Sequence, residues 1–175
     1  FGYNCMSYLS EFRGNMDALR QYANLGGSFM PYEKPPVAIY KKFVKSKNAF
    51  IVRNGAEFDE IYKNNHLSKG YFYILNEGGY LIYTIENDTL KVLEIAYTNL
   101  KNLQTILGFI HSHSSQVAKF SIKTAADGYL RMVLCEKGVD EIRYPHVMAK
   151  LLNKAISDPG DGINQNNYIN MLGWV

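Results

Sequence analysis

The stretch Tyr71–Ser112 constrains the fold of this 175-residue chain more than any other part of the sequence. Three strand-like runs follow one another there, separated by the turn sequences Asn76-Glu77-Gly78-Gly79 and Asn87-Asp88. Glycine and asparagine accept the positive φ angles that tight hairpins require. The runs are Tyr71–Leu75, Tyr80–Glu86 and Thr89–Tyr97, and a helix-like run begins at Leu100. This order predicts an antiparallel meander that leads into a helix.

The third run and the helix after it carry the clearest patterns. Thr89–Tyr97 has apolar residues on both faces, which predicts a central strand covered on both sides. Thr98 or Asn99 is expected to be the N-cap of the helix, because a short polar side chain there accepts from free backbone N–H groups. Within the helix the apolar residues recur at helical spacing, at Leu100, Leu103, Ile106, Leu107 and Ile110.

The remaining elements are predicted from apolar spacing and from turn residues. Helices are expected at Glu11–Tyr22, Val37–Lys45, Ala56–Lys63 and Tyr144–Ala155, and further strands at Phe1–Leu9, Gln116–Lys123 and Tyr129–Glu136. The predicted fold class is therefore α+β, with a mixed, antiparallel-rich central sheet flanked by helices.

Proline and glycine mark the expected domain limits. A passage rich in both residues ends at Pro36, and breakers of this kind often lie between domains. We expect residues 1–35 to be the end of a preceding domain or a linker, and residues 36–157 to form one domain. Residues 158–175 are expected to be a tail or the start of a following segment. The chain begins at Phe1 without an initiator methionine, so we expect it to be a fragment of a longer polypeptide.

Composition and charge exclude several classes of protein. The chain is 47% hydrophobic and 20% charged, as in ordinary globular proteins, and it contains two cysteines, too few for a disulfide framework. The net charge of +3 is mild, and the lysines near position 43 are expected to be the solvated face of a helix, so no nucleic-acid partner is expected. No signal peptide or membrane-spanning segment is recognisable, which predicts a cytoplasmic protein without a membrane partner.

The sequence His111-Ser112-His113 raises the question of a metal site. No cysteine or carboxylate lies close enough in sequence to complete a ligand set. Histidines at the end of a helix interact favourably with its dipole. A capping or surface role is therefore expected, and no metal site is predicted.

One set of residues stands in the order helix, helix, three-strand meander, helix, strand: Ile39-Tyr40-Lys41-Lys42-Phe43 with Arg53, Phe58 and Ile61, the meander Tyr71–Glu86, the strand Val92–Tyr97, and Asp127–Val133. This order and these residues resemble the GNAT acyltransferase family. The likeness is greatest to the second, degenerate GNAT domain of Eis-type multi-domain acetyltransferases, and it covers roughly Pro36 to Ile156. The resemblance implies a GNAT-like fold and, in the full-length protein, acetyl transfer from acetyl-CoA to an amine.

The resemblance also identifies candidate cofactor residues. In active GNAT enzymes a Gln/Arg-x-x-Gly-x-Gly/Ala segment after the fourth strand holds the pyrophosphate of acetyl-CoA through backbone N–H groups at a helix N-terminus. The matching positions here include Thr98, Asn99 and Lys101, and no glycine occurs between Tyr97 and Gly108. Acetyl-CoA is therefore expected to bind the full-length protein, and no cofactor is expected for this chain alone.

Two residues of the third strand are candidate catalytic groups. Glu94 lies in an otherwise apolar strand, at a position that suits the general base of a GNAT enzyme, and the alternative is a salt-bridged carboxylate. Tyr97 is a candidate phenolic acid, and the alternative is a packing residue with a hydrated hydroxyl.

Two hypotheses of function follow. The chain is either part of an Eis-type acetyltransferase, itself a degenerate and non-catalytic domain, or a structural, oligomerising or ligand-binding module with a GNAT-like fold. Expected partners are other domains of the same polypeptide and further copies of the chain in a homo-oligomer.

Overall fold

The computed structural model describes residues 4–45, 47, 50–76, 78–125, 127–134 and 138–149. These residues form a seven-stranded sheet with the order β2-β3-β4-β5-β6-β1-β7. The strands are β1 (Asn4–Asn15), β2 (Phe29–Pro31), β3 (Tyr71–Leu75), β4 (Gly79–Glu86), β5 (Thr89–Tyr97), β6 (Lys119–Ala125) and β7 (Asp140–Ala149). Five neighbouring pairs are antiparallel and the β5–β6 pair is parallel. The predicted α+β class with an antiparallel-rich sheet is confirmed.

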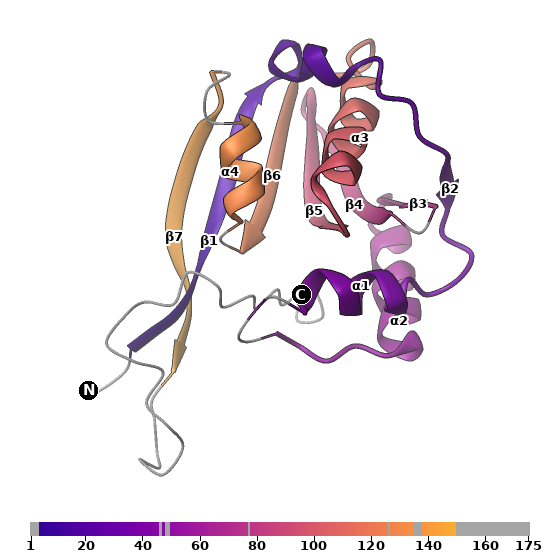
Figure 1. Ribbon diagram of the computed structural model, residues 1–175, viewed down its shortest axis with the longest axis vertical. Coiled ribbons are helices and arrows are strands. Elements are labelled where there is room, and N and C mark those ends of the chain that lie inside the picture. Colours follow the sequence, from indigo (N-terminus) through magenta and orange to yellow (C-terminus); the bar gives the residue numbers. More distant parts are fainter. Residues whose placement is uncertain are drawn as a thin grey trace.

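Helices lie on both faces of the sheet (Figure 1). They are the 3-10 helix η1 (Met16–Tyr22) and the α-helices α1 (Val37–Val44), α2 (Gly55–Leu67), α3 (Leu100–His111) and α4 (Gly128–Leu134). Side chains alternate between the two faces along a strand. In β4, Gly79 lies against Ile106 of α3, whereas Tyr80 contacts Phe58 of α2. α3 and α2 therefore lie on opposite faces, and η1 and α4 are on the α3 side.

Local sequence explains why the central elements form. Asn87 and Asp88 take φ angles of 49° and 60°, as a tight hairpin between β4 and β5 requires. The side chain of Asn99 accepts a hydrogen bond of 2.9 Å from the Asn102 backbone N–H, so Asn99 is the N-cap of α3. Asn54 caps α2 and forms a capping box with Glu57.

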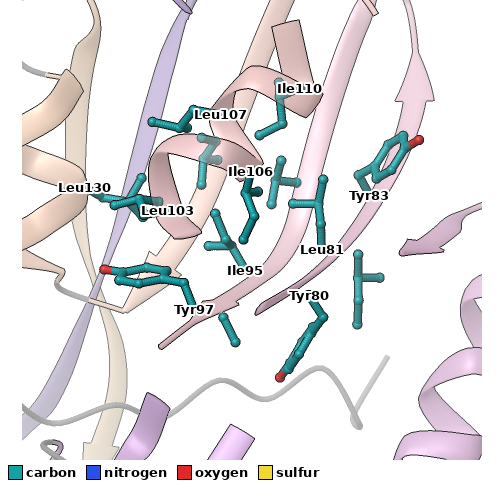
Figure 2. Packing of buried hydrophobic residues seen from close by; sticks show 14 of the residues in the cluster. Tyr80, Leu81, Tyr83, Ile95, Tyr97, Leu103, Ile106, Leu107, Ile110 and Leu130 are labelled. Atoms are coloured by element: carbon teal, nitrogen blue, oxygen red, sulfur yellow. The ribbon is translucent and has the colours of Figure 1, made fainter. Parts of the chain in front are cut away.

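The largest part of the core lies between α3 and the central strands (Figure 2). Figure 2 shows one row of α3 side chains against Leu81 and Ile95: Leu103, Ile106, Leu107 and Ile110. Gly108 lies on the neighbouring side of the helix. A Cβ atom there would collide with the carbonyl oxygen of Tyr22, so glycine allows η1 to lie directly on α3.

Three predicted elements were wrong. The helix expected at Glu11–Tyr22 begins only at Met16, because Glu11–Asn15 belong to β1 and pair with β6. The apolar residues of η1 recur every third residue, a spacing that resembles that of an α-helix.

The other two errors concern the end of the chain. Tyr129–Glu136, expected to be a strand, contains most of α4, because Asp127 Oδ1 accepts from the backbone N–H groups of Tyr129 and Leu130 and starts a helix. Residues 144–149 of the helix expected at Tyr144–Ala155 belong instead to β7, which pairs with β1. The rest of that predicted helix lies outside the described residues.

The first 35 residues contribute β1 and β2 to the same sheet as the later strands. The sheet therefore extends across the position where a boundary was expected, and the division into domains stays a prediction. Residues 158–175 lie outside the described residues.

Candidate site at the ends of the parallel strands

The parallel pair β5–β6 determines where a site is expected. Thr89–Val92 pair with Lys119–Ile122, α3 connects the two strands, and the strands diverge toward their carboxyl ends (Figure 1). In open sheets, ligands bind beyond the carboxyl ends of parallel strands, next to the start of a helix. That position lies beyond Tyr97, so the predicted residues Thr98, Asn99 and Lys101 are at the expected place.

Side chains of the chain itself lie at the carboxyl end of β5, where the strands diverge. Tyr97 is buried, and its hydroxyl donates a hydrogen bond of 2.5 Å to Asp127 Oδ1. The Tyr97 ring lies 5.2 Å from the ring of Phe43 in α1, measured between centroids. Lys47 Nζ lies 4.0 Å from Asp127 Oδ2 and 5.4 Å from the centre of the Phe43 ring. Figure 2 shows the Tyr97 ring beside Leu130 of α4.

Asp127 connects the Tyr97 side chain to α4. The same Oδ1 atom that accepts from Tyr97 also accepts from the Tyr129 and Leu130 backbone N–H groups, at 3.0 and 3.2 Å. The Tyr97 hydroxyl therefore belongs to a helix cap. The sequence offered one signal for Asp127, namely an aspartate directly before a helix, but that segment was predicted to be a strand.

Glu94 forms a buried ion pair on the other face of β5. Arg53 Nη1 donates to both carboxylate oxygens of Glu94, at 2.7 and 2.8 Å, and the Tyr80 hydroxyl donates to Oε1. The side chain of Glu94 is 0% exposed and that of Arg53 is 3% exposed. Since Arg53 directly precedes the N-cap of α2, this pair connects the start of α2 to the central strand.

The surroundings of Arg53 keep its guanidinium group protonated. Burial alone would lower the Arg53 pKa, but the charge of Glu94 and the hydrogen bonds to it raise the pKa above its ordinary value. The Arg53 guanidinium carbon lies 5.0 Å from the centre of the Tyr40 ring and 5.8 Å from that of Phe58. Burial also raises the pKa of Tyr40 to about 12. Glu94 is therefore paired with a permanent cation.

The two candidate catalytic residues are not brought together. Glu94 and Tyr97 are three positions apart in a strand, so their side chains point to opposite faces. A general base must come within about 3 Å of the proton that it removes. Both oxygens of Glu94 already accept hydrogen bonds, and the side chain has no exposed surface. The structure supports the salt-bridged alternative for Glu94.

The start of α3 is also occupied. Besides the cap by Asn99, the Thr98 hydroxyl donates to the Gly78 carbonyl at 3.2 Å and accepts from Asn102 Nδ2 at 2.8 Å. Lys101 is exposed. Two of the three candidate cofactor residues thus use their polar atoms inside the chain.

At the C-terminal end of α3, His113 has a structural role. His113 Nδ1 lies 3.0 Å from the Phe109 carbonyl oxygen, and Nε2 lies 3.0 Å from the Tyr83 hydroxyl. Because a carbonyl only accepts, Nδ1 carries the proton, and Tyr83 donates to Nε2. His113 therefore caps the end of α3, as expected. In the part of the chain that the structure describes, no group of three His, Cys, Asp or Glu residues is arranged to hold a metal ion. Among the described helices, none has the length and apolarity needed to span a membrane.

A family model described as "Acetyltransferase (GNAT) domain" matches residues 49–150, more than half of the chain. The chain belongs to this GNAT acetyltransferase domain family. The search of curated proteins returned no match. The GNAT resemblance inferred from the sequence is confirmed, with its fold.

Solved structures share the fold of this GNAT domain. A probable N-acyltransferase from Enterococcus faecalis has a TM-score of 0.67 and 21% identity, and the match covers 85% of this chain and 40% of that one. A GCN5-related N-acetyltransferase from Anabaena variabilis has a TM-score of 0.64 and 18% identity, covering 81% and 40%. Eis1 from Mycobacterium abscessus has a TM-score of 0.54 and 12% identity, covering 83% and 42%. The matched part thus spans about 40% of the length of these proteins.

Proposed function

We propose that this GNAT domain is a non-catalytic part of an Eis-type acetyltransferase, and that another domain of the full-length protein binds acetyl-CoA and transfers its acetyl group to an amine. One observation carries the proposal: at the carboxyl end of β5, where the cofactor is expected, the Tyr97 side chain is buried and bonded to Asp127.

Binding of acetyl-CoA at this place would be costly. The cofactor would have to displace the Tyr97 ring and break its hydrogen bond to Asp127, whose side chain is 1% exposed. A buried polar group left without a partner costs about 1–3 kcal/mol, and more when it is charged. Phosphate groups would also have to replace the Asn99 side chain at the start of α3, beside leucine where active enzymes have glycine.

Several residues that carry the Eis-type resemblance pack in the interior of this domain. Tyr40 and Phe58 pack against Arg53, which is paired with Glu94. They therefore position α1 and α2 on the sheet. The fold similarity to Eis1 supports the same assignment.

A second candidate function is a ligand-binding module in a protein with another activity. The observation that favours it is a polar cavity on the part of the sheet that α1 and α2 leave uncovered, described below.

The test uses the full-length protein and one exposed residue at the start of α3. Lys101→Ala is expected to leave the KM for acetyl-CoA unchanged to within about twofold, because the cofactor binds elsewhere. Lys63→Ala, at an exposed position of α2, is the matched control. A rise of about tenfold in KM for Lys101→Ala alone would assign cofactor binding to this domain and overturn the proposal.

A further inference from the structure

One surface of the sheet is polar and open. On the face that carries α1 and α2, the strands β5, β6 and β1 present alternate residues side by side, since Lys91 pairs with Ser121 and Arg13 pairs with Ser121 from the other side. We call this surface the basic face and define it by Glu11, Arg13, Asn15, Thr89, Lys91, Lys119, Ser121 and Lys123. None of the described helices contributes a residue to the lining of its cavity. The other lining residues are Gly14, Val92, Leu93, Phe120, Gly138 and Asp140.

The basic face lines an open cavity of about 540 Å³. Small-molecule sites have volumes of about 300–1,000 Å³. The cavity lies toward the amino ends of β5 and β6, away from Tyr97, and therefore does not depend on the proposed function.

A buried carboxylate positions the arginine of this cavity. One Glu11 oxygen accepts from the Ser121 hydroxyl at 2.6 Å, and the other accepts from Arg13 Nη2 at 2.7 Å. Burial would raise the pKa of Glu11, but these hydrogen bonds and the Arg13 charge lower it below its ordinary value. Glu11 is 5% exposed, whereas the side chain of Arg13 is 56% exposed. Arg13 is therefore anchored by one N–H group and presents the others to the cavity.

Two of the three lysines at this cavity, Lys119 and Lys123, supply positive charge that no described carboxylate pairs with. Lys91 is paired with Glu86 at 2.7 Å. Lys119 and Lys123 are exposed, and neither has a salt bridge to a described residue. The lining contains four cations and two carboxylates, and with Glu86 as the partner of Lys91 the net charge is +1, so an anionic ligand is attracted.

We propose that this cavity binds a small molecule that carries a phosphoryl group, with Arg13, Lys119 and Lys123 as the residues that contact the phosphoryl oxygens. A phosphomonoester carries a charge of about −2 at neutral pH and can therefore interact with several cations at once. The planar arginine offers paired N–H donors that match phosphoryl oxygens. Leu93 provides apolar surface for the rest of the molecule.

Lysine labelling read by mass spectrometry tests the proposal, with inorganic phosphate as the probe and chloride added to keep the ionic strength constant. Phosphate is expected to slow acetylation of Lys119 and Lys123 by acetic anhydride about threefold or more, with saturation in the millimolar range. Lys41 and Lys63, exposed on α1 and α2, are internal references and are expected not to respond. Equal slowing at the reference lysines, or no slowing at 20 mM phosphate, would overturn the proposal.

Two further arms separate alternative explanations. Arg13→Gln is expected to abolish the protection, and Arg20→Gln on η1 is expected to keep it, at equal net charge. The same labelling is repeated on the full-length protein and with a 20-nucleotide single-stranded DNA. If the two lysines are unreactive in the longer protein without phosphate, another domain covers the face and the proposal fails. Stronger protection by the oligonucleotide than by phosphate at equal phosphate concentration would also overturn it, in favour of a nucleic-acid surface.

Discussion

Toward the carboxyl ends of β5 and β6 the chain buries polar side chains against one another, whereas toward the amino ends of these strands a charged cavity is open. In the first region Tyr97 is bonded to Asp127, and Glu94 on the other face is bonded to Arg53. In the second region Lys119 and Lys123 project into solvent. Buried polar groups need partners and so contribute to the stability of the fold, whereas Lys119 and Lys123 are exposed and have no salt bridge to a described residue.

The largest change in stability is expected when the buried ion pair between Arg53 and Glu94 is broken. Glu94→Gln is expected to lower the free energy of unfolding by about 3–5 kcal/mol, because the Arg53 charge stays buried without a counter-charge. Glu86→Gln, which removes an exposed ion pair with Lys91, is the control and should cost less than about 1 kcal/mol. Urea denaturation measures both. Equal costs would contradict a structural role for Glu94.

The next effect concerns the Tyr97 hydroxyl. Tyr97→Phe is expected to cost about 1–3 kcal/mol, because buried Asp127 loses a hydrogen-bond donor. Tyr129→Phe, at a ring that is 57% exposed, should change stability by less than about 0.5 kcal/mol. The same denaturation experiment compares the two variants. An unchanged free energy of unfolding for Tyr97→Phe would show that the hydrogen bond to Asp127 does not hold the Tyr97 side chain in place.

A smaller effect is expected at the start of α3. Asn99→Ala should cost about 1 kcal/mol, because the Asn102 N–H loses its acceptor, and Asn99→Ser should restore most of it. Thermal unfolding followed by circular dichroism measures the difference. If alanine and serine behave alike, Asn99 does not cap the helix and the start of α3 is free for an anion.

The smallest effect is a pH dependence at the open cavity. The Glu11 pKa is lowered in the folded chain from an ordinary value of 4.5, so its contribution to stability is present above pH 4.5 and is lost as the pH falls through the folded pKa. Glu11→Gln should therefore reduce the loss of stability between neutral pH and pH 3. Unfolding midpoints at a series of pH values measure the slope, and an unchanged slope would show that Glu11 is not held ionised by Arg13 and Ser121.

How much of the structure the sequence predicts depends on the distance between interacting residues. The meander and α3 were predicted because their signals are local, namely the turn Asn87-Asp88 and the Asn99 cap. The strand expected at Phe1–Leu9 covers the first half of β1, but the second half of β1 and all of β7 were missed because each is determined by pairing with a distant strand. For the same reason the partners of the candidate residues could not be foreseen, since Asp127 is 30 residues from Tyr97 and Arg53 is 41 residues from Glu94.

The basic face was also invisible in the sequence. Its members come from three strands, and Glu11 and Ser121 are 110 residues apart. The lysine cluster that does stand out, around position 43, is partly engaged elsewhere, with Lys47 beside Asp127.

Calorimetric titration of the 175-residue chain with acetyl-CoA tests the central claim most directly. Because Tyr97 is buried against Asp127 and the start of α3 is capped by Asn99, we expect no binding in the micromolar range. The same titration with the Lys119→Gln/Lys123→Gln variant excludes a contribution from the basic face. Micromolar binding that persists in this variant, and that is lost in Lys101→Ala, would contradict a closed and non-catalytic site.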